Sequence, residues 1–315
     1  MSQAAAYPTS TGARVVSSIL DLIGNTPLIR IHVFDAEHPG VEFYAKAEWF
    51  NPGGSVKDRP AKRMIEEAER SGELTRDRTI IDSTSGNTGI GYALVAAAKG
   101  YRLKLVMPRN VSRERVETVR AYGAEVVFSD PLEGSDGAIL LCREIVAADP
   151  ELYYKPDQYN NPMNPQAHYD STGPEIVAQT QGRITHFVAG LGTSGTIVGT
   201  GRFLHDHDPS IRVVAVQPSD NFMGLEGLKH IPTAIRPGIY DDTVHDVLLD
   251  VQTEDAYDLA RQVAHNEGLM VGHSCGAALW GAQQVARTVE TGVVVMIFPD
   301  GGDRYLSSGL YTSPF

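Results

Sequence analysis

The residue with the clearest chemical potential is Lys57, which lies in the stretch 51–59 (NPGGSVKDR). A lysine that forms a Schiff base must present its amine at a fixed point, and a tight turn that opens a helix can do this. The glycines and the proline of the stretch favour such a turn. Ser55 is a candidate helix cap, and Pro60 suits a first helical turn. The alternative is a surface lysine after an ordinary turn, since most lysines are surface charges.

A second stretch with chemical potential is the glycine- and hydroxyl-rich turn at residues 190–196 (GLGTSGT). It follows an apolar run and precedes a helical pattern, which is the arrangement that binds phosphate through backbone amides and a helix N-terminus. It is not a P-loop, because no Gly-Lys-Ser/Thr follows. An ordinary glycine-rich turn remains the alternative.

Two further turns have the same position between a strand-like run and a helix-like run. Residues 83–89 (STSGNTG) suit a substrate carboxylate, because an anion is favoured at a helix N-terminus, and Asn87 could donate to a phenolate oxygen of a cofactor. An elaborate helix cap is the alternative. The third turn is at residues 272–277 (GHSCGA). Considered by itself, Ser274 is predicted to be a helix cap. We expect Cys275 to be a small packing residue and His273 to be a packed or solvated side chain.

These turns must be positioned by a regular alternation of strands and helices with short links, which predicts βαβ units and parallel sheets. Two α/β sheets that meet at a cleft fit this layout, with ligands at the carboxyl ends of the strands. Two stretches interrupt the alternation: residues 153–174, predicted as a long loop with a hinge, and residues 220–240. The predicted strands are 28–33, 42–47, 79–82, 102–107, 125–128, 185–189, 212–217, 247–251 and 293–298; the predicted helices are 15–22, 60–70, 86–99, 112–122, 135–148, 196–205, 254–266 and 275–288.

The net charge, the cysteine content and the apolar runs of the chain each argue against some classes of protein. The chain has 315 residues and a net charge of −12, which argues against non-specific binding to nucleic acid. Its two cysteines form neither a disulfide framework nor a metal-ligand pattern, so we expect no metal and a cytoplasmic location. Residues 1–14 have no apolar core typical of a signal peptide, and no apolar run is long enough to cross a bilayer.

The motifs together resemble those of cysteine synthases (O-acetylserine sulfhydrylases). These are fold-type II, tryptophan-synthase-β-like enzymes that use pyridoxal phosphate (PLP). The resemblance covers residues 20–310, and the matching motifs are 24–28 (GNTPL), 51–59, 84–89, 192–196, Gln158, 161–162, 172–175 and 300–307. It implies an α/β fold with two three-layer α/β/α domains around a PLP cleft. The larger, cofactor-phosphate-binding domain would comprise 1–48 and 155–315, and the smaller, mobile substrate-binding domain 49–154.

The resemblance also implies a role for each matching residue. Lys57 would hold PLP as a Schiff base and act as general base, Asn87 would bond the phenolic oxygen, and Ser274 would face the pyridine nitrogen. The cofactor phosphate would be held by Gly192, Thr193, Ser194, Gly195 and Thr196. The substrate would be bound by Thr84, Ser85, Gly86, Thr88 and Gln158. The implied reaction is a β-replacement that makes L-cysteine from O-acetyl-L-serine and sulfide.

Two other substrates stay open within this family. Lys229 lies near the place where enzymes that use O-phospho-L-serine carry a basic residue, and Arg236 is a second candidate. A surface charge is the alternative for Lys229. Cystathionine β-synthase activity is the second alternative. A serine or threonine dehydratase is disfavoured, because the residues around Gln158 match the synthases better. The resemblance implies a homodimer, with serine acetyltransferase or a sulfur-carrier protein as possible partners.

Two functions of other classes also compete. A non-catalytic binding module with the same fold would not require Lys57, Asn87 and Ser274 together. A nucleotide-dependent dehydrogenase is disfavoured, because no acidic residue is placed about 20 residues after a proper Gly-x-Gly-x-x-Gly turn.

Overall fold

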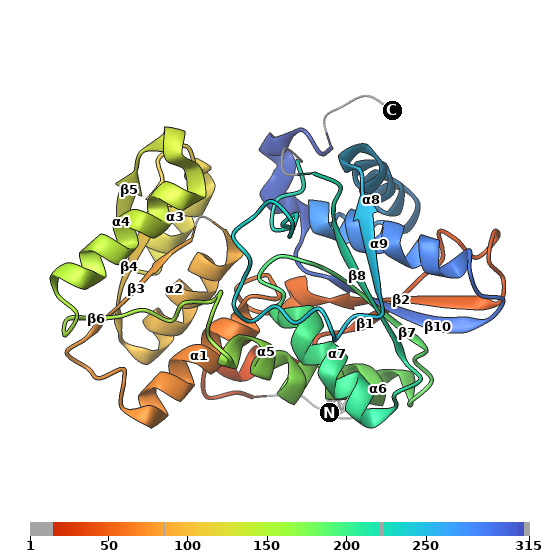
Figure 1. Ribbon diagram of the computed structural model, residues 1–315, viewed down its shortest axis with the longest axis horizontal. Helices are drawn as coiled ribbons and strands as arrows, with labels where there is room; N and C mark the ends of the chain where they lie inside the picture. The colour runs from red at the N-terminus through yellow and green to blue at the C-terminus, as the bar shows by residue number, and fades with distance from the viewer. Residues whose placement is uncertain (1–14, 85, 221–223, 312–315) are drawn as a thin grey trace, which may run out of the picture.

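The computed structural model describes residues 15–84, 86–220 and 224–311, which form two β-sheets that lie side by side (Figure 1). Neighbouring strands are parallel throughout both sheets, except that β1 pairs with β2 in the antiparallel direction. The predicted α/β class with parallel sheets is therefore confirmed. The six-stranded sheet has the order β1 (Leu28–Ile31), β2 (Val41–Ala47), β10 (Gly292–Phe298), β7 (His186–Gly190), β8 (Arg212–Pro218) and β9 (Val247–Val251); the four-stranded sheet has the order β5 (Glu125–Ser129), β4 (Arg102–Pro108), β3 (Thr79–Ser83) and β6 (Tyr153–Tyr154).

Helices cover both faces of each sheet. Helices α8 and α9 lie on one side of the six-stranded sheet, and α6 and α7 lie on the other (Figure 1). Alternate strand residues point in opposite directions, so Val188 of β7 packs in the same core cluster as α8 and α9, whereas Phe187 packs with α6 and α7. In the smaller sheet, Ile80 packs towards α1 and α2, and Ile81 packs towards α4. The α-helices are α1 (Asp58–Ser71), α2 (Asn87–Lys99), α3 (Arg113–Ala121), α4 (Gly134–Ala148), α5 (Met163–Ala167), α6 (Gly173–Thr180), α7 (Gly195–His207), α8 (Thr253–Glu267) and α9 (His273–Ala286).

Helix α1 follows the turn that presents Lys57. Its buried positions include Met64 and Ile65, which repeat at helical spacing, and Gly72 ends the helix with a left-handed φ of 81°. Lys57 itself is the residue that precedes the helix, and Ser55 accepts a hydrogen bond from the backbone N–H of Lys57 at 3.2 Å. Ser55 therefore fixes the turn one step before the helix, instead of capping the helix directly as predicted.

A buried cluster of charges anchors the first turn of α1. The guanidinium of Arg59 bonds both carboxylate oxygens of Glu48 at 2.7 and 2.8 Å and both of Glu175 at 2.7 and 2.8 Å. Lys46 Nζ lies 2.6 Å from Glu175 Oε2. These residues come from β2, the short helix Glu48–Phe50, α1 and α6. Arg59, two residues after Lys57, is thus held by segments from the N-terminal part and from the middle of the chain.

The structure corrects two sequence-based expectations. Much of the stretch 153–174, predicted as a loop, is helical: α5 continues through the π-helix His168–Thr172 into α6. The predicted helix at 15–22 is reduced to the short 3-10 helix Ile19–Leu22. Other short helices are Glu48–Phe50, Pro131–Glu133 and Gly302–Ser308. None of the helices in the described ranges has the length and apolar character needed to span a membrane.

Candidate active site

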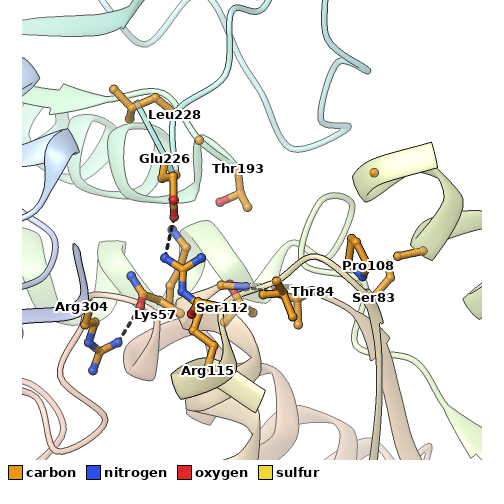
Figure 2. A pocket seen from close by; sticks show the side chains of 18 of the residues that line it. Lys57, Ser83, Thr84, Pro108, Ser112, Arg115, Thr193, Glu226, Leu228 and Arg304 are labelled. Carbon is orange, nitrogen blue, oxygen red and sulfur yellow. Dashed lines mark hydrogen bonds and ion pairs between the residues drawn. The ribbon is translucent and has the colours of Figure 1, made fainter. Parts of the chain in front are cut away.

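A cavity of about 650 Å³ is lined by residues that precede or begin helices of both sheets (Figure 2). A smaller hollow shares several of its lining residues and adds Ser274 and Asp300. The segments that start α1, α2, α7 and α9 all line one or both of these spaces. Four helix N-termini make the site favourable for anions, because their backbone N–H groups and dipoles carry partial positive charge.

Lys57 lines both the cavity and the hollow. Within the described part of the chain, its Nζ makes no hydrogen bond and no ion pair. Burial lowers the pKa of the Lys57 amine, and the negative charge of Asp300 opposes this effect. The geometry rules out the alternative of a surface lysine, and a lowered pKa favours the neutral amine that a nucleophile or general base needs.

The turn before α7 lies at the junction of the two spaces. Gly192 and Thr193 line both of them, Ser194 and Thr196 line the hollow, and Gly195 lines neither. Ser194 has a left-handed φ of 70°, which turns the chain sharply into the helix. A Cβ atom at position 192 would lie 2.4 Å from the carbonyl oxygen of Gly227, so the close approach of these two segments requires glycine.

The turn before α2 and the segment around Gln158 face the same cavity. Thr84, Gly86, Thr88 and Gln158 all line it, and the hydroxyl of Thr88 donates to Gln158 Oε1 at 2.7 Å. Ser85, the remaining member of this predicted set, lies outside the described residues. These four residues, which were predicted to bind the substrate, line one cavity although they come from different segments.

The turn before α9 brings Ser274 to the hollow. His273 is 1% exposed and packs against Tyr257 and Tyr305, with ring centroids 4.9 and 4.3 Å away. Burial lowers the pKa of His273 to about 4, so the ring is neutral near pH 7. Cys275 is buried and its thiol pKa is raised well above the ordinary value, also by burial. Both neighbours of Ser274 are packing residues, as predicted.

Asn87 is held from two sides by residues to which the motifs assign no role. Its Nδ2 donates to Asp300 Oδ2 at 2.6 Å, and its Oδ1 accepts from Arg304 Nη1 at 2.5 Å. The hydroxyl of Tyr305 also donates to Asp300 Oδ2, at 2.6 Å. Burial raises the pKa of Asp300, and the bonds from Tyr305 and Asn87 oppose this rise. Residues 300–307 were recognised as a motif, but the sequence alone could not show that they contact Asn87.

An ion pair joins the two sides of the cavity. Arg115 Nη2 in α3 lies 2.5 Å from Glu226 Oε2, which belongs to the irregular stretch after β8 (Figure 2). Both residues line the cavity. This pair was not predictable from the sequence, because its members are 111 positions apart and neither belongs to a motif.

Lys229 and Arg236 are the two cations predicted near a substrate phosphate, and only Lys229 lines the cavity. Its Nζ lies 5.1 Å from the ring centroid of Tyr159, and burial lowers the pKa of its amine. Arg236 is not among the lining residues; it pairs with Asp242 at 3.1 Å and lies over the ring of Tyr240. The position of Lys229 distinguishes it from an ordinary surface charge.

The residues present fit PLP. They offer an amine that has no hydrogen-bond partner among the described residues, a glycine-rich turn at a helix N-terminus, and an amide and a hydroxyl at the same hollow. A phosphate, an aldehyde and a polar ring are the groups that such donors suit. The His, Cys, Asp and Glu side chains of the described ranges form no cluster that could hold a metal ion.

Comparisons with known proteins agree with this chemistry. Residues 19–300 match the model of the family described as pyridoxal-phosphate dependent enzymes. The chain is 53% identical to a cysteine synthase of Aquifex aeolicus over 94% of this chain and 92% of the relative. It is 44% identical to cysteine synthase B of Salmonella typhimurium, over 94% and 96% of the two chains. The crystal structure of O-acetyl serine sulfhydrylase isoform 3 from Entamoeba histolytica superposes with a TM-score of 0.92 at 36% identity, over 96% and 94% of the chains. The chain therefore belongs to the family of pyridoxal-phosphate dependent enzymes.

Proposed function

We propose that this protein is a PLP-dependent cysteine synthase that makes L-cysteine from O-acetyl-L-serine and sulfide. The observation that carries the proposal is the 53% identity to a cysteine synthase over nearly the whole chain. The site adds support, because Lys57 and residues of the three turns at 83–89, 190–196 and 272–277 all line the hollow.

In this proposal, the residues take the roles that the resemblance to cysteine synthases implies. Lys57 would bind the cofactor aldehyde, Asn87 would donate to the phenolic oxygen, and Ser274 would lie beside the pyridine nitrogen. The phosphate is held by Gly192, Thr193, Ser194, Gly195 and Thr196. The substrate carboxylate is held by Thr84, Ser85, Gly86, Thr88 and Gln158, where the N-terminus of α2 favours an anion.

When bound, PLP supplies an electron sink for the α-carbon of the amino acid. Lys57 Nζ then removes the α-proton as a general base, and its lowered pKa favours the neutral form that can do so. The α2 N-terminus orients the substrate, so that the acetate leaves from the β-carbon and sulfide adds at the same carbon. Acetate departs before sulfide reacts, which predicts ping-pong kinetics.

The test of this proposal separates the two halves of the reaction. O-acetylserine alone should release about one acetate per active site in a rapid burst, and cysteine should form only when sulfide is added. Homocysteine in place of sulfide reports a cystathionine synthase, and the release of pyruvate and ammonia without any added nucleophile reports a dehydratase-type elimination. A protein that binds PLP but shows no acetate burst would contradict the proposed substrate.

Gly192→Ala should weaken PLP binding at the phosphate turn. The new methyl group would lie 2.4 Å from the carbonyl oxygen of Gly227, so one of the two segments must move away. We expect a cost of roughly 1–3 kcal/mol, or about tenfold or more in the PLP dissociation constant. Gly292→Ala is the control: its Cβ atom would lie 2.9 Å from the hydroxyl oxygen of Thr185, and neither residue lines the cavity or the hollow, so a loss of PLP affinity there would report a general packing defect. Equal PLP affinity in Gly192→Ala and wild type would contradict this packing argument.

O-phospho-L-serine is the second candidate substrate, and the position of Lys229 in the cavity favours it. Lys229→Met should lower kcat/KM for O-phosphoserine by roughly tenfold relative to O-acetylserine, since a hydrogen bond to a charged group contributes about 1.5–3 kcal/mol. Arg236→Met is the matched control, because Arg236 does not line the cavity. An equal change for both substrates in Lys229→Met would argue against a phosphate contact at this residue.

We further propose that residues 49–154 form a smaller, mobile substrate-binding domain, and that residues 1–48 and 155–315 form the larger domain. The proposal is supported by the four-stranded sheet, whose strands all lie between residues 79 and 154. We also propose a homodimer in the cytoplasm, where two free, buried thiols would persist, with serine acetyltransferase or a sulfur-carrier protein as partner. Light scattering after size-exclusion chromatography tests the dimer.

A further inference from the structure

The carboxylate of Asp300 occupies an unusual position at the base of the site. It is 1% exposed, lies two residues after the end of β10, and lines the hollow together with Lys57 and Ser274. Oδ2 accepts two hydrogen bonds, whereas Oδ1 has no hydrogen-bond partner among the described residues. A buried carboxylate oxygen without a partner is uncommon and costs stability, so the fold alone does not account for this residue.

The backbone around Asp300 is shaped to admit the side chain. A Cβ atom at Gly272 would lie 2.1 Å from Asp300 Oδ1, so only glycine leaves room for the carboxylate beside the start of α9. The backbone N–H of Gly272 donates to the carbonyl oxygen of Asp300 at 3.2 Å, which holds the two segments together. The carboxylate is therefore fixed in place before any ligand binds.

The side-chain amide of Asn87 has only one orientation that satisfies both neighbours. Arg304 is a donor without any acceptor atom, so the group that faces it at 2.5 Å must be Asn87 Oδ1. Ionised Asp300 is an acceptor only, so the group that faces it at 2.6 Å must be Asn87 Nδ2. Arg304 is itself anchored, because its Nη2 donates to the carbonyl oxygen of Gly53. The amide cannot turn over without losing two charge-assisted hydrogen bonds.

This orientation matters for the cofactor. Nδ2 carries two hydrogens, and Asp300 takes one of them, which leaves the other for a ligand in the cavity that Asn87 lines. A turned amide would instead present Oδ1 to the phenolic oxygen of PLP, and two acceptors would repel each other. We propose that Asp300 and Arg304 are positioning residues that lock the Asn87 amide with its free N–H towards the PLP phenolic oxygen. This inference rests on the proposed function and adds two residues to it.

A double-mutant cycle on PLP binding tests the inference. PLP is titrated into the apoproteins of wild type, Asn87→Ala, Asp300→Ala and the double variant, and both the dissociation constant and the visible absorbance maximum are recorded. Asp300→Ala should weaken binding roughly tenfold in the wild-type background, the worth of one charge-assisted hydrogen bond. It should have less than about a twofold effect in the Asn87→Ala background, because no amide remains to be positioned.

Three further variants keep the test decisive. Asp300→Asn retains an acceptor oxygen and should recover most of the affinity that Asp300→Ala loses. Arg304→Lys probes the other side of the amide without touching Asp300, and its effect should also vanish when Asn87 is alanine. Asp303→Ala, an exposed residue of the same segment, is the matched control. Thermal unfolding of each apoprotein separates loss of the fold from loss of the cofactor.

The outcomes distinguish the inference from the proposed function. Equal losses of affinity in both backgrounds, or no loss in Asp300→Ala, would overturn the positioning role while PLP binding by wild type still stood. Absence of any effect in Asn87→Ala would overturn it as well. Failure of the wild-type apoprotein to bind PLP would instead contradict the proposed function itself.

Discussion

Lys57→Ala should lower the rate of cysteine formation by about 10²–10⁴-fold, the usual contribution of a general base. The variant removes the amine that lines both spaces of the site, and no other lysine lines the hollow. It should also lose the covalent link to PLP, so the visible absorbance of the purified protein should disappear or shift. Steady-state assays with O-acetylserine and sulfide, together with an absorbance spectrum, measure both effects.

Lys62→Ala, in the helix that follows Lys57, is the matched control. Its amine donates to the carbonyl oxygen of Leu20 at 3.1 Å, and it does not line the cavity, so we expect an unchanged rate and spectrum. Wild-type activity in Lys57→Ala would show that another group takes the proton. Activity lost from both variants would point to damage of α1 instead of loss of the base.

Arg59→Met should destabilise the protein by roughly 3–5 kcal/mol, the cost of breaking a buried ion pair by removing one partner. Arg59 is 3% exposed, and Glu48, which it bonds through both carboxylate oxygens, is completely buried. Without Arg59, Glu48 keeps a bond from Thr26 but loses its balancing charge. Urea unfolding of the apoprotein measures the loss. Arg63→Met is the control, because the pair between Arg63 and Asp170 is exposed and contributes less than about 1 kcal/mol.

The same charge cluster sets a pH dependence with a definite sign. The bonds from Arg59 and Lys46 lower the pKa of Glu175 to about 2, although burial acts in the opposite direction. The unfolded value is about 4.3, so the stabilisation is fully present above that pH and is lost as the pH falls towards 2. Wild type should therefore lose stability in this window, and Arg59→Met should lose less. Parallel curves for the two proteins would contradict the assignment.

Much of the fold followed from the sequence, because alternating apolar runs and glycines mark most elements. Gly72, Gly100 and Gly268 each end a helix in the left-handed conformation, where a C-terminal glycine is expected. The stretch 153–174 misled the prediction because it is rich in proline and asparagine. Pro165 lies in the first turn of α5, where a missing N–H costs nothing, so a proline there does not prevent a helix.

The candidate site was predictable where a short motif contained the whole feature. The turns around Asn87 and Thr193 follow strands and open helices, so their convergence at the carboxyl ends of the strands could be expected. The partners Asp300 and Arg115 could not be foreseen in the same way. Each forms its contact with a residue more than 100 positions away, and that distance is closed only by the packing of the two sheets.

The order of the strands also has a consequence for how the chain folds during synthesis. Strand β2 lies between β1 and β10, and β10 is synthesised after all the other described strands. All four strands of the smaller sheet are complete by residue 154, whereas the parallel neighbour of β2 is synthesised on the order of tens of seconds after β2. We therefore expect the inserted sheet to form first on the nascent chain. Until β10 has been synthesised, the apolar surface of β1 and β2 would remain uncovered, and chaperones would have the greatest influence in that interval.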